Sequence, residues 1–345
     1  MNVFKRIDRK SLQLITLSVV MFAIMVALRG ELFFRPINLS NMMMQLVEPG
    51  FFALCIGVAY LSRGIDLSCV AIANLVSIVN GMMVHTFLLP DGSNQTFLLV
   101  MVVVNAVLIG LACGLINGFF VAKLGIFPIL VTLGTQNVFM GIGMIMTEGR
   151  AIMGFPEPLV NLGRTQYFGI PMLTILFLVV FLALCIIVHK TPYGLKLQWM
   201  GSNKKAAWYS GIDNVRVTIT TFMLSGLIAG IAGIIIMART NSAMANYGLP
   251  FVFQALLICV LAGISPLGGR GKIYNILFSL IAIQILSTGF NLLRVSPLIR
   301  DSLFGFLLVL ALGLDLFGEK LRNRRLIKRS ETAEATATPA GEEPD

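Results

Sequence analysis

The sequence predicts an all-α protein that crosses the membrane about ten times. Three observations lead to this fold class: 57% of the 345 residues are hydrophobic, only 12% are charged, and the mean hydropathy is +0.88. Soluble domains and disordered chains both carry far more charge than this. The apolar residues come in long runs, and a run of about 17 to 25 residues crosses the ~30 Å hydrocarbon core as a helix.

The apolar runs predict the helices in chain order. The seven clearest are Ser11–Leu28, Met43–Leu61, Leu67–Leu89, Phe97–Phe120, Ile126–Met146, Ile170–Val188 and Val217–Met237. Three shorter or glycine-punctuated runs bring the count to about ten: Phe251–Gly263, Tyr274–Phe290 and Leu303–Phe317. No small-residue cleavage site follows the first run before Arg29, so this run is expected to be an uncleaved anchor rather than a signal peptide.

The basic residues indicate the orientation of these helices. With a cytoplasmic amino terminus, 19 of the 26 lysines and arginines fall on the inner side, in agreement with the positive-inside rule. Both termini are therefore expected in the cytoplasm. Residues 1–10 form a basic start and residues 11–317 the membrane domain. Residues 318–345 form a basic, then acidic tail that has no apolar periodicity and is expected to be disordered.

Several kinds of chemistry find no support in the sequence. The five cysteines lie inside apolar runs without a Cys-x-x-Cys pair, and His85 and His189 have no cluster of cysteines or carboxylates nearby, so no metal site is expected. The stretch "GGRGK" at Gly268–Lys272 lacks the first glycine and the final Ser or Thr of a phosphate loop. No catalytic residue is expected. Nucleic-acid binding is not expected either, because the basic residues form small clusters rather than one stripe.

Small residues recur every four positions in two of the predicted helices. Such faces let two helices approach closely in a membrane. Close packing within one chain is favoured over a seam between two copies, although either arrangement uses the same faces. The candidate packing residues are Gly110, Gly114, Gly118, Gly226 and Gly230.

Polar side chains inside the apolar runs suggest a path for a solute. Amides predominate among them, and an amide both donates and accepts hydrogen bonds, which suits a neutral polyol better than an ion. Hydrogen bonding between helices is the alternative role for any single amide. A neutral solute needs no counter-charge, so Glu48 is expected to tolerate replacement by glutamine. The candidate path residues are Glu48, Asn74, Asn137, Gln254 and Asn291.

The longest polar interruption, "GSNKKAAWYSGI" at Gly201–Ile212, predicts a short helix. Asn203 is a suitable N-cap and Gly211 a suitable residue just after the helix end, so Lys204–Ser210 should form about two turns. A helix of this length is not stable alone and must dock on another surface.

Two faces of this short helix offer two docking modes. Ala206 and Ala207 give it a flat face that fits a groove of a partner. Trp208 and Tyr209 offer the alternative, in which they anchor the helix on the lipid surface.

Six segments in order resemble the permease subunits of bacterial ATP-binding-cassette importers for monosaccharides. This family includes ribose, galactose, arabinose and autoinducer-2 transporters. The resemblance covers nearly the whole chain except the tail, and the chain departs from the family's usual glycines at Ser62–Arg63, Cys69–Val70, Ala262 and Ile264. The matching stretches are "GIDLS" (64–68), "GLINGFFVAKLGIFPILVTLGT" (114–135), "GSNKKAAWYSGI" (201–212), "LSGLIAGIAGIIIMAR" (224–239), "LAGISPLGGRGK" (261–272) and "GFNLLRV" (289–295).

The resemblance implies a fold of the larger importer class in the bacterial inner membrane. The expected partners are a cytoplasmic ATP-binding-cassette ATPase, a periplasmic or lipid-anchored sugar-binding protein and a second permease subunit, identical or paralogous, all beside membrane lipid. No cofactor is expected in this chain, because the ATPase binds the ATP. In the family the loop between the sixth and seventh helices, here 189–216, couples to the ATPase. The residues implied are Gly201, Asn203, Lys204, Ala206, Ala207, Ser210 and Gly211.

Two other functions remain open at this point. The first is an ion-coupled secondary transporter of a small polar solute, which needs an essential carboxylate in the membrane. Its candidates are Glu48, Asp66 and Asp315, of which the last two lie near the ends of predicted spans. The second is a membrane-embedded enzyme, for which the sequence offers no nucleophile motif.

Overall fold

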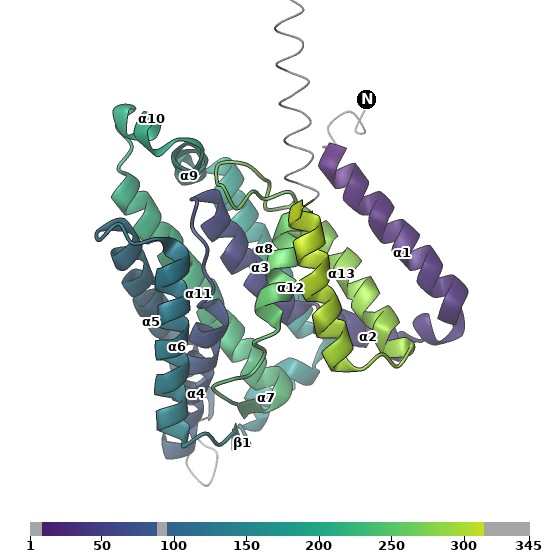
Figure 1. Ribbon diagram of the computed structural model, residues 1–345. Coiled ribbons are helices and arrows are strands. Elements are labelled where there is room, and N and C mark those ends of the chain that lie inside the picture. Colours follow the sequence, from purple (N-terminus) through teal and green to yellow (C-terminus); the bar gives the residue numbers. More distant parts are fainter. Residues whose placement is uncertain (1–8, 88–94, 314–345) are drawn as a thin grey trace, which may run out of the picture.

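A computed structural model describes residues 9–87 and 95–313 as a bundle of long helices (Figure 1). Eight spans in this part are long and apolar enough to cross a membrane. The short apolar helix α12 (Phe251–Leu261) and the helical residues 297–313 complete the set. The eight are α1 (Arg9–Phe33), α2 with α3 (Pro36–Gln45 and Val47–Leu61), α4 (Cys69–Phe87), α5 (Gln95–Ala122), α6 (Pro128–Thr147), α8 (Met172–Lys190), α11 (Asn214–Thr240) and α13 (Asn275–Leu292).

Each predicted span therefore has a helical counterpart, and the all-α polytopic membrane fold is confirmed. The end of the third predicted span, the end of the tenth and the whole tail 318–345 lie outside the described residues.

The connections contain short helices and strands, most of which the sequence did not predict. The helices are α7 (Glu157–Arg164), α9 (Pro192–Ser202) and α10 (Lys204–Tyr209), of which only α10 was expected. Two antiparallel strand pairs lie at the end of the bundle opposite α9 and α10 (Figure 1). Strand β1 (Ile152–Met153) pairs with β4 (Ser242–Ala243), and β2 (Gln166–Tyr167) pairs with β3 (Ile170–Pro171).

The second span begins at Pro36, earlier than the predicted Met43, and is interrupted at Leu46. Pro49 explains the interruption, because proline has no N–H to donate to the carbonyl of Gln45 and its ring crowds the preceding turn. Helical hydrogen bonding resumes where the amide of Gly50 donates to Leu46 O at 3.0 Å. The span is thus divided into α2 and α3.

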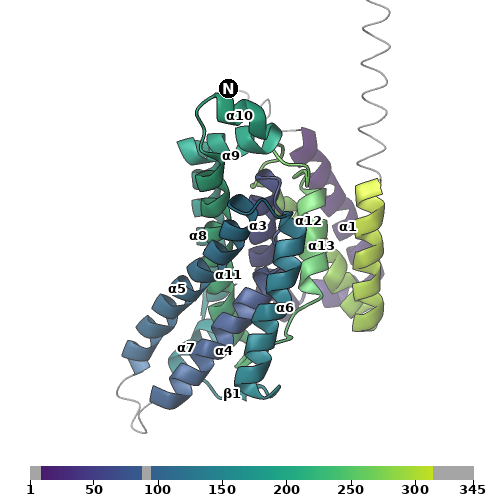
Figure 2. The same cartoon turned by 60° about the vertical axis from the view of Figure 1, so that its left-hand side comes forward.

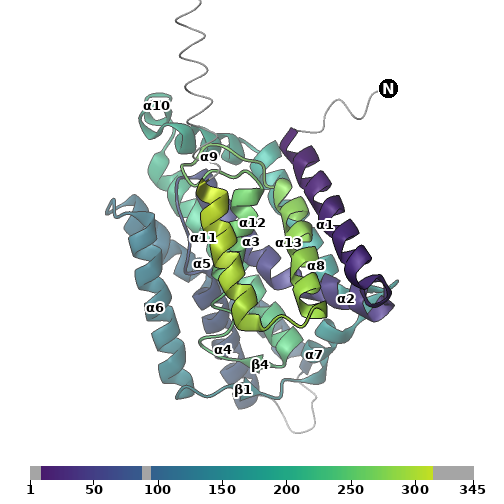
Figure 3. The ribbon, with the colours of Figure 1, turned by 45° about the vertical axis from the view of Figure 1, so that its right-hand side comes forward.

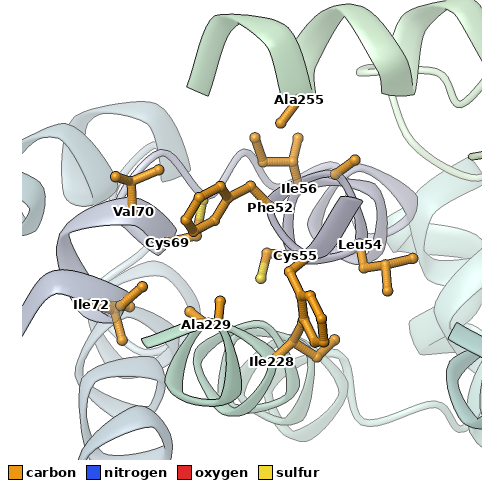
Figure 4. Close-up of a cluster of buried hydrophobic side chains, with 14 of the residues drawn as sticks. Phe52, Leu54, Cys55, Ile56, Cys69, Val70, Ile72, Ile228, Ala229 and Ala255 are labelled. Atoms are coloured by element: carbon orange, nitrogen blue, oxygen red, sulfur yellow. The ribbon is translucent and has the colours of Figure 1, made fainter. Parts of the chain in front are cut away.

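Helix α3 lies at the centre of the bundle. All 15 of its residues are buried, whereas only 17% of the span in α1 is buried. Figure 4 shows Phe52 and Cys55 of α3 surrounded by side chains of α4, α11 and α12. Helix α1 packs mainly on α13 at the periphery, as Figure 3 also shows.

Helices α5 and α11 pack at backbone contact (Figure 2). A Cβ added at Gly114 would lie 2.8 Å from Met223 Cα, and one at Gly226 would lie 2.9 Å from Gly114 Cα. Because the obstructing atoms are backbone, no rotamer change makes room for a side chain. All the predicted small residues lie at this seam within a single chain. Gly110, Gly114, Gly226 and Gly230 meet one another, and Gly118 meets the backbone of Ile219.

Candidate functional site

A polar cavity lies near the end of the bundle that carries α2 and β4. Its volume is about 250 Å³, somewhat below the ~300–1,000 Å³ of drug-sized ligand pockets. Amide, hydroxyl and guanidinium groups from five helical segments converge on it, so it can hydrogen-bond to a small polar solute. The lining residues are Gln45, Pro49, Arg239, Phe251, Gln254, Gln284, Ser287, Asn291 and Arg300.

Glu48 forms a buried ion pair beside this cavity. One carboxylate oxygen lies 3.2 Å from Nη1 of Arg239, and the two side chains are 1% and 24% exposed. The hydroxyl of Tyr247 donates to the same carboxylate at 3.0 Å. The carboxylate therefore has a counter-charge within the chain, which the sequence did not predict and which leads to a different expectation for Glu48→Gln.

Asn74 holds the loop that carries Tyr247. Its buried side-chain amide donates to the carbonyl oxygens of Ala245 at 3.0 Å and Tyr247 at 2.8 Å. Asn74 therefore acts one step away from the cavity, by fixing the residue that hydrogen-bonds to Glu48.

The amide of Gln254 is an open polar group of the cavity, as is the hydroxyl of Ser287. Gln254 is 7% exposed, and its side chain makes no hydrogen bond to any residue that the structure describes. The neighbouring Gln284, by contrast, donates to Gln45 Oε1 and Thr288 Oγ1, both at 3.2 Å. A buried amide without a partner costs free energy unless a ligand or water supplies one, so Gln254 is the first candidate to contact a solute.

The structure brings together some predicted path residues but not all. Gln254 and Asn291 line the cavity, and Glu48 lies beside it. Asn137 lies on the exposed face of α6, where its amide donates to Leu133 O of the same helix at 2.9 Å. Asn137 is therefore not part of this cavity.

A larger cavity of about 780 Å³ lies between α1, α12, α13 and residues 297–313. Its lining is hydrocarbon except for Lys10 and Gln13. It contains none of the predicted path residues, and its lining does not suit a polyol.

The expected docking segment lies at the other end of the bundle. Asn203 caps α10, as its sequence predicts, by accepting from the amides of Lys205 at 3.0 Å and Ala206 at 3.1 Å. Gly211 ends the turn with φ 78°. The side chain of Asn214 donates to Lys204 O at 2.8 Å and fixes α10 to the start of α11.

Ala207 was predicted to lie on the face of α10 that contacts a partner, and this prediction is wrong. This side chain is only 4% exposed because it packs inside its own chain. The exposed residues of α10 are instead Lys204, Lys205, Ala206, Trp208 and Tyr209, the last two being 64% and 80% exposed. Two adjacent alanines in a six-residue helix gave no pattern from which the inward one could be identified.

Asp66, in the loop between α3 and α4, is also buried. The whole length of α3 separates it from Glu48. The carboxylate of Asp66 accepts from Ser68 Oγ and Ser225 Oγ, both at 2.6 Å. Burial raises the pKa of this carboxyl, and the hydrogen bonds from Ser225 and Ser68 oppose the rise. The bond from Ser225 ties the loop to α11, which is a structural role. Asp315 lies outside the described residues.

Arg239 and Tyr247 were not among the site residues predicted from the sequence. Arg239 lies in the last turn of the apolar helix α11, and its charge at a span end on the same side as Glu48 was the available signal. Tyr247 lies in an irregular loop and gave no signal.

Comparison with known proteins identifies the family. Residues 38–312 match the family described as branched-chain amino acid transport system / permease component. The ribose import permease protein of Bacillus subtilis (strain 168) is 32% identical over 302 residues, which are 87% of this chain and 91% of that protein. The D-allose transport system permease protein of Escherichia coli (strain K12) is 32% identical over 297 residues, 85% and 89% of the two chains.

A third relative, the L-arabinose transport system permease protein of the same Escherichia coli strain, is 32% identical over 210 residues, 60% of this chain and 63% of that protein. No solved structure matches the chain. The resemblance drawn from the six motifs is confirmed, and the chain belongs to the family of branched-chain amino acid transport system permease components, beside relatives that are permeases of sugar transport systems.

Proposed function

We propose that this chain is the membrane permease of an ATP-binding-cassette importer and forms the path for a monosaccharide or a similar small polyol. The observation that carries the proposal is the amide-lined cavity in which Gln254 makes no side-chain hydrogen bond to a described residue. Amides that both donate and accept match the hydroxyls of a sugar, and the relatives named for ribose, allose and arabinose support the same class of solute.

In this proposal the chain itself performs no reaction and binds no cofactor. A cytoplasmic ATPase binds and hydrolyses ATP, and a periplasmic or lipid-anchored binding protein delivers the sugar. A second permease subunit completes the path. Closure of the ATPase pair moves α10, and the movement reaches the helices around the cavity.

Gln254→Leu should lower ATP-driven uptake of the transported sugar roughly tenfold, because one buried hydrogen bond to the solute is lost. Uptake of radiolabelled pentoses and hexoses into proteoliposomes with the cognate ATPase and binding protein measures this. Asn105→Leu is the matched control, since its amide lies in a span but, among the described residues, hydrogen-bonds only to Met83 Sδ, at 3.0 Å. Equal uptake by wild type and the Gln254 variant would remove this residue from the path.

The orientation proposed is that both termini, α9 and α10 face the bacterial cytoplasm. Cysteines replacing Lys123 or Lys205 should then react with an impermeant thiol reagent only in inverted vesicles, in line with the positive-inside rule. A cysteine replacing Phe168, which is fully exposed at the opposite end, should react in intact cells. The reverse pattern would invert the proposed topology.

The contact with the ATPase is proposed to use Trp208 and Tyr209, because Ala207 is covered by its own chain. Changing both aromatic residues to alanine should reduce co-purification of the ATPase in detergent by more than about tenfold, as for buried aromatic anchors of interfaces. The control is Phe127→Ala, an aromatic side chain that is 76% exposed on another loop. Unchanged co-purification would instead favour a helix that rests on lipid, since detergent removes the bilayer.

A further inference from the structure

Arg63 has an unusual backbone conformation at the end of α3 that lies opposite Glu48. Its φ is 64°, in the left-handed region that disfavours residues with a Cβ and favours glycine. Glycine follows immediately at position 64, so the turn itself does not need an arginine here. The long side chain therefore calls for its own explanation.

The guanidinium of Arg63 connects three separate segments. Its Nε donates to Leu267 O at 2.6 Å, and its Nη2 donates to Ser202 O at 3.2 Å. Ser202 is the last residue of α9, directly before the cap of α10, and Leu267 lies in the loop between α12 and α13. One side chain thus joins the end of α3 to the docking segment and to a third loop.

Backbone contacts bring the same three segments together. The amide of Gly269 donates to Leu61 O at 3.1 Å. A Cβ at Gly201 would collide with Leu61 O, and one at Gly268 would lie 2.9 Å from the backbone nitrogen of Arg63. These glycines let the segments approach closely enough for the guanidinium to reach both carbonyl oxygens.

The contact between Arg63, Ser202 and Leu267 is not densely packed on all sides. A cavity of about 240 Å³ adjoins it, lined by Arg63, Ser202, Ser265, Leu267, Gly268 and Arg270. The cavity leaves this side of the junction without dense packing. The two hydrogen bonds from Arg63 and the bond from Gly269 contribute to the connection there.

Helix α3 leads from this junction directly to the polar cavity. It is buried along its whole length, and a close-packed helix moves as a unit rather than deforming locally. Its other end carries Glu48, which pairs with Arg239 at the cavity wall.

We infer that Arg63 is a positioning residue that clamps the α9–α10 segment to α3 and thereby transmits movement of α10 to the cavity. This inference rests on the proposed function for its consequence in transport, but the clamp itself is a property of the free permease. Because the acceptors are carbonyl oxygens and not carboxylates, salt should weaken the clamp little.

Arg63→Gly tests the clamp without damage to the turn, since glycine accepts the left-handed backbone more readily than arginine. Hydrogen–deuterium exchange on the purified permease should show roughly tenfold faster exchange in residues 192–211, because charged hydrogen bonds are lost. The matched control is Arg294→Gly. Arg294 also has a positive φ, 58°, but its side chain makes no bond to any residue of the described chain.

In the complete complex, Arg63→Gly should lower the number of sugar molecules imported per ATP hydrolysed at least threefold, while the ATPase stays bound. Arg63→Lys keeps the charge but lacks the planar fork that reaches two carbonyls, so it should behave like the glycine variant. Full rescue by lysine would assign the effect to charge and overturn the clamp.

Two further outcomes decide against the inference. Unchanged exchange in Arg63→Gly would show that the guanidinium does not hold the segment. Faster exchange with an unchanged import-to-ATP ratio would show that the clamp lies off the coupling route. If wild type itself shows no ATP-driven sugar uptake, the proposed function fails, and the exchange measurement still tests the clamp.

Discussion

Glu48→Gln should destabilise the permease by about 3 kcal/mol and abolish most uptake. Removing one partner of a buried ion pair typically costs ~3–5 kcal/mol, and the lower figure applies because the Arg239 side chain is 24% exposed. The variant leaves the guanidinium of Arg239 without its carboxylate at the cavity wall. Thermal unfolding of the detergent-solubilised protein and uptake in proteoliposomes measure the two effects.

The double variant Glu48→Gln with Arg239→Gln shows whether the loss of stability comes from the unpaired charge or from the glutamine side chain at position 48. It should recover much of the lost stability, because no unpaired charge remains buried. Glu157→Gln serves as the control, since Glu157 is exposed on α7. Wild-type stability and uptake in the single variant would show that the pair contributes little and that the sequence expectation for Glu48 was correct.

Gly114→Ala and Gly141→Ala should shift stability in opposite directions, although both place a methyl group in a membrane helix. At Gly114 the new Cβ meets the backbone of Phe222 and Met223 on α11, so the seam must separate, at a cost of about 1–3 kcal/mol or more. At Gly141 nothing lies within 4 Å, and alanine should stabilise the helix by a few tenths to ~1 kcal/mol. Unfolding of the two variants in parallel measures the difference. An equal effect at both positions would mean that the seam is not tight.

The helices were predictable because hydropathy over a span is a local signal. Helix α4 and the cap Asn203 could be predicted without knowledge of distant residues. The pairing of Glu48 with Arg239 could not be predicted in this way, because the two residues lie on helices far apart in sequence. Hydropathy places Glu48 within one predicted span and Arg239 just after another, but it does not say which helices are neighbours.

The cavity was predictable only in part for the same reason. Gln254 and Asn291 were found because an amide in an apolar run is costly. Asn137 met the same criterion, yet its amide bonds within its own helix, so composition alone did not separate the two cases. Helix α9 was missed because its polar sequence resembles a loop, and it is held by tertiary contacts such as the bond between Tyr193 and Thr221 at 2.9 Å.

The distance along the chain between Glu48 and its partners has a consequence for biosynthesis. Tyr247 follows Glu48 by 199 residues, which a ribosome needs roughly 10–40 s to translate at about 5–20 residues per second. During that interval α3 is inserted while its carboxylate has no guanidinium or hydroxyl to meet. We therefore expect the nascent chain to be more sensitive to membrane proteases before α11 emerges, and a ribosomal pause between α3 and α11 to lower the yield of mature permease.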